Sequence, residues 1–477
     1  MGVSDQIRIL KAIVPRMPMV GKTALYRLLG LSDMAKEWDL KTEITVNVVR
    51  SFIVPRPVST AQRSSLRDPG IKGNMWISKV ALPAPEEDSI RQCLFHAIEA
   101  LKEPGEAPGG YIKPELKPVE AEWTGYREAA TKKSPELKIS EAEKYEEMMK
   151  EVTSPTTILY FHGGAYYLFD PAFYRPTTSK LAKLTKGRCL SVRYRLAPQN
   201  PFPAALLDGL VCYFNLLYPP EGSLHKPVDP KHIVFSGDSA GGNLSMALLE
   251  TLQQFRRMNM KIHWHGAERE VPLPAGVALN SPWMDITHSS PSCDSNARYD
   301  YLPTRSAHPN GVFYPPCLIW PPNPPRKTLF ADDAVLCHPL VSPMAAKNWT
   351  GSPPIWIVTG SELLSDEDKY VAMVAARQGV TVIIEEFEAM PHCFAMILQG
   401  HELERKCFTL WTDFMRTVVE NPESLKTRGT LYKVKTLEEE NVDVEKLVSF
   451  TDSEVRDRMR QRMGEMSPQQ PDPLHKS

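Results

Sequence analysis

The stretch that most constrains this chain is residues 234–243, VFSGDSAGGN, in which Ser239 stands two residues from a glycine on each side. A strand-like run, KHIVFSGD, precedes it, and a helix-like run, AGGNLSMALLETL, follows it. In the pattern G-x-S-x-G the two glycines let a strand and a helix approach across a very sharp turn, which lifts the serine hydroxyl clear of the backbone. The pattern predicts a nucleophile at Ser239, at a helix N-terminus where the amide of Ala240 faces an anion.

Composition narrows the classes of function. The 56 Lys and Arg residues nearly cancel the 57 Asp and Glu residues, so we expect no nucleic-acid partner. The eight cysteines are scattered without a C-x-x-C pair, which indicates reduced thiols. His263 and His265 lie two apart with no third ligand nearby, so we expect surface residues there and neither a metal nor a cofactor.

The chain has no apolar run of the roughly 18 residues that span a bilayer. Its N-terminus also lacks the uninterrupted apolar stretch of a signal peptide. We therefore expect an intracellular, cytoplasmic protein.

Strands and helices alternate regularly beyond residue 152. Three successive strand–helix units predict an α/β fold, with a mostly parallel central sheet and helices on both faces. The alternation stops from about residue 286 to 353, a segment that contains the proline-rich run YPPCLIWPPNPPRK. Because proline lacks an amide donor and has a fixed φ, we expect this insertion to form a cap over the carboxyl edge of the sheet.

The pattern divides the chain into three regions. Residues 1–40 form an amphipathic cap segment, with Ile7, Leu10, Ile13 and Val14 at helical spacing and basic residues between them. Such a segment either packs on its own domain or lies on a membrane surface. Residues 41–420 form the catalytic domain, with expected strands at TEITVNVV and MWISKVALP and a helix over 90–101. Residues 421–477 form a charged tail with one short helix, opened by a capping box at Thr451 and Glu454.

A serine hydroxyl needs a base, and the base needs an orienting acid. His392, in FEAMPHCFAM, directly follows an expected strand and precedes a helix, so it is the candidate base. The acid is expected in SELLSDEDKY, after the strand PIWIVTG; Asp366 is the first choice and Glu362 the second. Glu367 and Asp368 are expected to be solvated residues of the next helix's first turn.

Backbone amides are expected to bind the negative oxygen of the reaction intermediate. YFHGGAYY ends a strand with Gly163 and Gly164, whose amides can turn toward one cavity together with the amide of Ala240. The neighbouring aromatic residues are expected either to line the substrate pocket or to pack in the core; they are Tyr166, Tyr167 and Trp283.

Seven segments carry a family resemblance: FHGGAYY, YRLAPQNPFPAALLD, GDSAGGN, NSPWMDIT, HPLVSP, LLSDED and MPHCF. In this order, over about residues 120–420, they resemble the hormone-sensitive-lipase-like branch of the α/β-hydrolase fold. The resemblance implies a carboxylic ester hydrolase with Ser239, Asp366 and His392 as its triad. It also implies an oxyanion hole of Gly163, Gly164 and Ala240, and a cap built from the N-terminal segment and the insertion.

Three departures from the family pattern are visible. Ala165 replaces the usual third glycine of H-G-G-G and narrows the expected acyl pocket. Glu362 stands where many relatives have an aspartate four residues before the triad acid. The insertion is longer and richer in proline than in compact bacterial relatives, so their substrate class does not transfer.

We therefore expect a serine hydrolase that cleaves esters of short to medium acyl groups through an acyl-enzyme. Acetyl esters of a sterol or a secondary metabolite are one candidate class. Activity should fall below about pH 6, where His392 gains a proton. A membrane- or lipid-droplet-associated lipase is the alternative, while the presence of His392 argues against a non-catalytic receptor of the same fold. The oligomeric state is left open.

Overall fold

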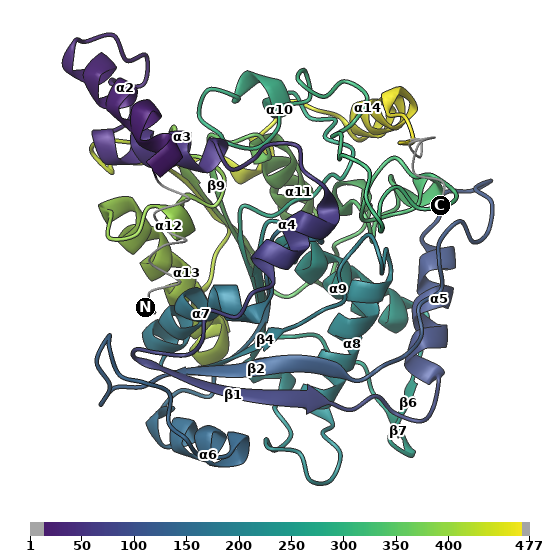
Figure 1. The fold of residues 1–477 in the computed structure, drawn as a ribbon. Helices are drawn as coiled ribbons and strands as arrows, with labels where there is room; N and C mark the ends of the chain where they lie inside the picture. Colours follow the sequence, from purple (N-terminus) through teal and green to yellow (C-terminus); the bar gives the residue numbers. More distant parts are fainter. Residues whose placement is uncertain (1–13, 470–477) are drawn as a thin grey trace.

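The computed structural model describes residues 14–469, which form one ten-stranded sheet wrapped by helices (Figure 1). The strands, in spatial order, are β1 (Met75–Leu82), β2 (Val119–Tyr126), β4 (Arg188–Val192), β3 (Thr157–Phe161), β5 (Ile233–Asp238), β8 (Gly276–Asn280), β9 (Ile355–Gly360), β10 (Val382–Phe387), β11 (Arg428–Tyr432) and β12 (Glu439–Val442). From β4 to β11 all neighbours are parallel. Their carboxyl ends therefore meet at one edge.

Helices cover both faces of the sheet, as Figure 1 shows. One core contains side chains of α5 (Ser89–Ala100), α8 (Ala204–Leu217), α9 (Ala240–Arg257) and α11 (Ser365–Arg377). The other contains side chains of α7 (Pro171–Thr185), α12 (Phe394–Ile397) and α13 (Glu402–Glu420). The central strands β3, β5 and β8 are buried along their whole length, as strands covered on both faces must be. The predicted fold class is confirmed.

The segment TEITVNVV is a helix, so the predicted strand there is wrong. It lies in α3 (Leu40–Arg50), beside α2 (Met17–Leu28). The Asp39 carboxylate caps α3 by accepting a hydrogen bond from the Thr42 amide at 2.7 Å. Thr42 and Val46 lie four residues apart and are both buried, so they share the inner face of the helix. The β-branched residues that favour a strand by propensity are therefore used here in a helix. The strand and the helix predicted next are present as β1 and α5.

The predicted boundary after residue 420 is also wrong. Strands β11 and β12 extend the main sheet, because β11 pairs in parallel with β10. The predicted helix with its capping box is present as α14 (Asp452–Glu465). Residues 286–353 add no strand to the sheet, as predicted, and contain only short helices such as α10 (Ser292–Ser295).

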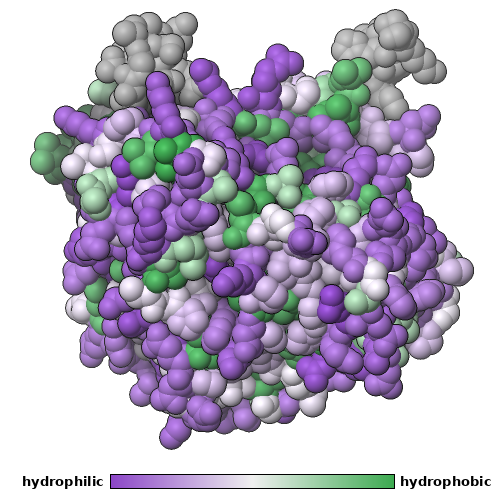
Figure 2. Space-filling model, turned by 90° about the horizontal axis from the view of Figure 1, so that it is seen from below, coloured by the Kyte–Doolittle hydropathy of each residue, from purple (hydrophilic) through white to green (hydrophobic). Residues whose placement is uncertain are grey.

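The predicted N-terminal helix rests largely on Ile7, Leu10 and Ile13, which lie outside the described residues. Among residues 14–469, each helix is too short or too polar to cross a bilayer. Figure 2 shows that the face of the molecule seen from below is largely hydrophilic, with small hydrophobic patches separated from one another.

Candidate active site

Ser239 sits at a tight junction between β5 and α9. Its φ of 52° lies in the left-handed region that residues with a side chain rarely adopt. A Cβ added to Gly241 would lie 1.9 Å from the carbonyl oxygen of Phe161, and one added to Gly237 would lie 2.5 Å from the backbone of Gly241. Both glycines are therefore required by the close approach of strand and helix, and the structure places Ser239 on the predicted turn.

Gly241→Ala is expected to lower the free energy of unfolding by at least about 3 kcal/mol, because backbone atoms cannot yield to the new methyl group. Gly464→Ala is the matched control. A Cβ at Gly464, in α14, meets no atom of residues 14–469 within 4 Å, so alanine there should stabilise the helix by about 0.5–1 kcal/mol. Urea unfolding followed by circular dichroism measures both, and equal midpoints for the two variants would contradict the steric argument.

His392 follows β10, and its Nδ1 lies 2.8 Å from Oε1 of Glu362. Both side chains are buried. The prediction that Asp366 is the carboxylate beside His392 is therefore wrong. Oδ2 of Asp366 accepts a hydrogen bond from the Ser292 amide at 2.9 Å. The reason is position: Glu362 lies two residues after β9, at the carboxyl edge of the sheet, whereas Asp366 lies in the first turn of α11.

Ser281 links the acid and the histidine, and the sequence analysis missed it. Its Oγ donates to Oε2 of Glu362 at 2.7 Å and accepts from the Cys393 amide at 3.0 Å. The Ser239 amide donates to the carbonyl of Asn280, the residue before Ser281, at 3.1 Å. The end of β8 thus contacts all three loops, and the motif NSPWMDIT was the available signal for it.

Asp300, in the insertion, joins the same two loops. Its Oδ2 accepts from the Leu363 amide at 2.8 Å, and its Oδ1 accepts from the His392 amide at 3.4 Å. Its own carbonyl accepts from Nε of Arg50 in α3 at 2.7 Å. The N-terminal helices and the insertion are therefore connected to the loops that carry Glu362 and His392.

Glu367 and Asp368 are fully buried, so the expectation that they are solvated is wrong. Oε1 of Glu367 accepts from the amides of Met284 and Asp285 at 2.7 and 3.1 Å. Burial, and then the negative charge of Glu362, hold the pKa of Asp368 well above its usual range. The first turn of α11 thus faces the core, and β9 and the loop after β8 cover it.

Two opposing effects act on His392. Burial lowers its pKa, but the neighbouring Cys393 and Glu362 raise it by more, so the pKa lies well above the usual 6.5. The Cys393 Sγ lies 3.5 Å from His392 Nε2, and burial raises the pKa of this thiol to about 12. The thiol is therefore neutral near pH 7, and the Glu362 carboxylate supplies the charge that favours imidazolium.

The loop after β3 supplies candidate backbone amides for an oxyanion hole, but they differ from the predicted set of Gly163, Gly164 and Ala240. The Gly163 amide donates to Oδ1 of Asp238 at 3.1 Å, so it is already engaged. Within residues 14–469, the amides of Gly164, Ala165 and Ala240 donate no hydrogen bond to the protein. Ala165, with φ of 51°, was missed as an amide donor, although it occupies the position of the third glycine of the H-G-G-G pattern.

Asp238 anchors this loop from the residue before the serine. Its carboxylate also accepts from the hydroxyls of Tyr160 and Tyr174, at 2.7 and 3.0 Å. Burial raises the pKa of Asp238 to about 6. The Gly163 hydrogen bond joins the Gly163–Gly164 turn to the residue before Ser239, and the two tyrosine hydroxyls hold the Asp238 carboxylate in place.

The aromatic residues near the turns differ in their surroundings. Tyr166 is buried, stacks on Phe330 of the insertion at 3.6 Å between ring centroids, and donates its hydroxyl to Asn243 at 2.6 Å. These contacts favour packing over pocket lining for Tyr166. Tyr167 contacts the Tyr314 ring, and Trp283 contacts the His288 ring. His263 and His265 lie on or beside the hairpin of β6 (Ile262–Trp264) and β7 (Ala267–Arg269).

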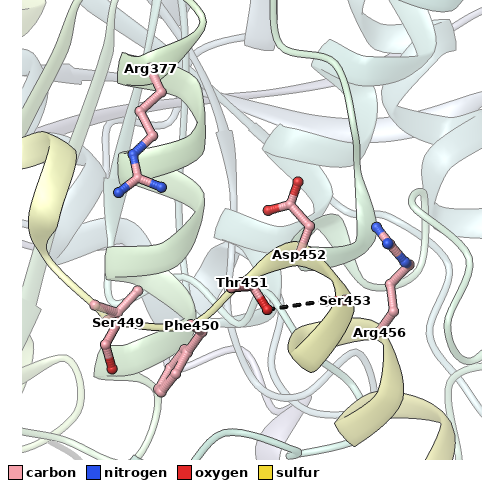
Figure 3. A pocket seen from close by; sticks show the side chains of 8 residues that line it. Arg377, Ser449, Phe450, Thr451, Asp452, Ser453 and Arg456 are labelled. Atoms are coloured by element: carbon pink, nitrogen blue, oxygen red, sulfur yellow. Dashed lines mark hydrogen bonds between the residues drawn. The ribbon is translucent and has the colours of Figure 1, made fainter.

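A surface pocket of about 610 Å³ lies elsewhere, where α11 meets the start of α14. Figure 3 shows Arg377 and Arg456 approaching it from these two helices, with Asp452 and Phe450 beside them. Oδ1 of Asp452 accepts from the Tyr370 hydroxyl at 2.8 Å. None of the residues that line this pocket is a predicted site residue.

Comparison with known proteins identifies the family of the chain. A family model described as alpha/beta hydrolase fold matches residues 158–315 and 319–396. The chain is 31% identical over 238 residues to an acetyl-hydrolase of Streptomyces hygroscopicus, covering 50% of this chain and 67% of the relative. It is 29% identical over 252 residues to an esterase of Acinetobacter venetianus, covering 53% of this chain and 71% of the relative.

The fold is shared with solved structures. An esterase from the bacterial hormone-sensitive lipase family has a TM-score of 0.51 at 22% identity, covering 80% of this chain and 99% of that one. An esterase/lipase from an uncultured bacterium has a TM-score of 0.52 at 21% identity, with the same coverage. The chain therefore belongs to the α/β-hydrolase fold family, as its seven motifs predict.

Proposed function

We propose that this chain hydrolyses carboxylic esters with Ser239 as nucleophile, His392 as general base and Glu362 as the carboxylate that orients the imidazole. The hydrogen bond of 2.8 Å between His392 Nδ1 and Glu362 Oε1 carries the proposal. It fixes the tautomer that leaves Nε2 able to accept the serine proton. Glu362 replaces Asp366 in this role.

The reaction would proceed in two displacements. Ser239 Oγ attacks the ester carbonyl as His392 Nε2 takes its proton, and that proton then goes to the departing alcohol. Water, deprotonated by the same imidazole, releases the acid and restores the serine. Glu362 stabilises the imidazolium that forms in each step.

The negative oxygen of each tetrahedral intermediate needs donors that are ready before it forms. We assign this role to the amides of Gly164, Ala165 and Ala240, because each lacks an acceptor in the part of the chain that the structure describes. Ala240 also begins α9, so the positive end of that helix favours an anion at the same place. Gly163 acts indirectly, by holding the turn through Asp238.

Short to medium acyl esters are the proposed substrates, with acetyl esters of a sterol or a secondary metabolite as one class. Two observations support a small acyl group: the relative named acetyl-hydrolase and the side chain of Ala165 where a glycine is usual. p-Nitrophenyl esters from acetate to palmitate test this. We expect the largest kcat/KM at acetate or butyrate; a maximum at palmitate would replace the proposal with a lipase.

The pH dependence follows from His392. The base works only as neutral imidazole, so activity is present above its pKa and is lost as the pH falls through that value. Because this pKa is raised, we expect the acid limb of kcat/KM to have its midpoint above pH 6.5, higher than the value near 6 expected from sequence. Initial rates on p-nitrophenyl butyrate from pH 5 to 9 would measure it, and a midpoint near 6 or below would contradict the influence of Glu362.

A further inference from the structure

Exposed apolar side chains gather on the N-terminal helices. We call residues 14–54 the cap hairpin; it contains α2, α3 and the segments next to them. Of the 19 large hydrophobic residues that are exposed within residues 14–469, 11 belong to it, so their distribution is not that of scattered surface residues. They are Val14, Met17, Leu25, Tyr26, Leu28, Leu29, Leu31, Leu40, Phe52, Ile53 and Val54.

The outer side of α2 is largely apolar. Met17, Leu25 and Leu28 recur at helical spacing, and Lys22 lies between them, with its ammonium over the Tyr26 ring. Leu28 is 83% exposed, and Leu29 and Leu31 continue the apolar surface into the turn after the helix. Figure 1 shows α2 and α3 standing out from the corner of the molecule, at the upper left. This surface is a projection and not a groove.

The inner side of the cap hairpin is packed. Thr23, Thr42 and Val46 are buried between the helices and the body of the protein. Arg27 pairs with Glu43 at 2.9 Å, and the Trp38 indole donates to the carbonyl of Ala389 at 2.6 Å. The exposed leucines therefore lie on an ordered element whose polar anchoring contacts face inward.

The net charge of the cap hairpin favours an anionic partner. Residues 14–54 carry six Lys and Arg against four Asp and Glu, and Glu43 is turned inward. Three lysines of the cap hairpin, Lys22, Lys36 and Lys41, are exposed against two exposed acidic residues, Asp33 and Asp39. A second copy of the same surface would bring like charges together, whereas an anionic lipid surface offers both acyl chains and negative headgroups. We infer that the cap hairpin docks the protein onto anionic lipid bilayers, with Leu28, Leu29 and Leu31 inserted.

Vesicle co-sedimentation of the full chain tests this without reference to catalysis. Wild-type protein should bind vesicles of phosphatidylcholine mixed with phosphatidylserine, and should bind pure phosphatidylcholine more weakly. The triple variant Leu28→Ser, Leu29→Ser, Leu31→Ser should bind the mixed vesicles at least about tenfold more weakly, because it loses the apolar contacts. The matched control is Leu137→Ser, Leu184→Ser, Leu318→Ser, which alters three exposed leucines outside the cap hairpin and should bind like wild type.

The charges are tested separately. Lys22→Glu with Lys36→Glu should weaken binding to the mixed vesicles by at least about tenfold, since each basic residue near an anionic surface adds to affinity. Raising the ionic strength from about 0.1 to about 1 M should weaken wild-type binding, because it shortens the Debye length to about 3 Å. Circular dichroism and the thermal midpoint confirm that each variant is folded.

Three results would overturn the inference. The first is wild-type protein that stays with the supernatant of mixed vesicles. The second is a folded Leu28, Leu29, Leu31 variant that binds as tightly as its matched control. The third is a wild-type dimer in sedimentation velocity that becomes a monomer in the Leu28, Leu29, Leu31 variant, while the two proteins bind vesicles equally well. This result would assign the apolar surface to contact with a second copy of the chain.

Discussion

Ser239→Ala is expected to lower kcat/KM for p-nitrophenyl butyrate by about 10⁴- to 10⁶-fold, the loss typical of removing a triad nucleophile. The substitution removes only the Oγ atom, so the turn at φ of 52° and its backbone contacts stay as they are. The residual rate should come from substrate binding and from the oxyanion amides, which the variant retains. Stopped assays with purified protein, compared with the uncatalysed rate, measure the loss.

Ser236→Ala is the matched control for the nucleophile. Ser236 lies three residues earlier in β5 and is buried, and its Oγ donates to the carbonyl of Ala278 at 2.7 Å. Losing this hydrogen bond should reduce stability by about 1 kcal/mol while leaving the rate within a few fold. Equal activity of wild type and Ser239→Ala would remove Ser239 from the mechanism, and an equal loss in both variants would indicate a folding defect.

Glu362→Gln should reduce kcat by about 10⁴-fold, while Asp366→Asn should stay within about threefold of wild type. An amide can donate to His392 Nδ1, which stabilises the tautomer whose Nε2 carries the proton and cannot accept one from Ser239. Asp366→Asn keeps an oxygen able to accept from the Ser292 amide, its present contact. KM should change little in either variant, because both carboxylates hydrogen-bond to protein groups, Glu362 to His392 and Asp366 to Ser292.

Two measurements distinguish a role of Glu362 in orienting His392 from a role in folding alone. Glu362→Gln removes a negative charge from beside His392, so the acid limb of its residual activity should move to lower pH. Glu362→Asp should recover part of the rate, since the carboxylate is kept but its reach is shorter by one methylene. If Asp366→Asn lowers kcat as much as Glu362→Gln does, with both variants folded, Asp366 would again be the candidate acid of the triad.

The parts of the site that could be predicted from sequence depend on local geometry. Ser239, Gly237 and Gly241 were predicted because a strand-to-helix turn this tight excludes a Cβ at both glycines. His392 was identified because it follows an expected strand directly. The alternation of strands and helices likewise predicted the parallel sheet, since adjacent parallel strands need a crossover.

Other features depend on contacts between distant segments. Asp366 and Glu362 both follow β9 closely, and only the folded chain shows that Glu362 contacts His392, 30 residues away. The Gly163 amide looked free until Asp238, 75 residues later, was seen to bind it. Periodicity could not separate a helix from a strand in residues 40–50, because the choice depends on which side chains the rest of the protein buries.

The sequence by itself therefore determined the fold class and pointed to Ser239 and His392 as the proposed nucleophile and base, because short-range sterics and periodicity are properties of neighbouring residues. The tertiary structure decided which carboxylate meets the imidazole, which amides remain unpaired and which apolar residues stay exposed on the cap hairpin. Each of these outcomes is set by the packing of segments far apart in the chain, which no local pattern records.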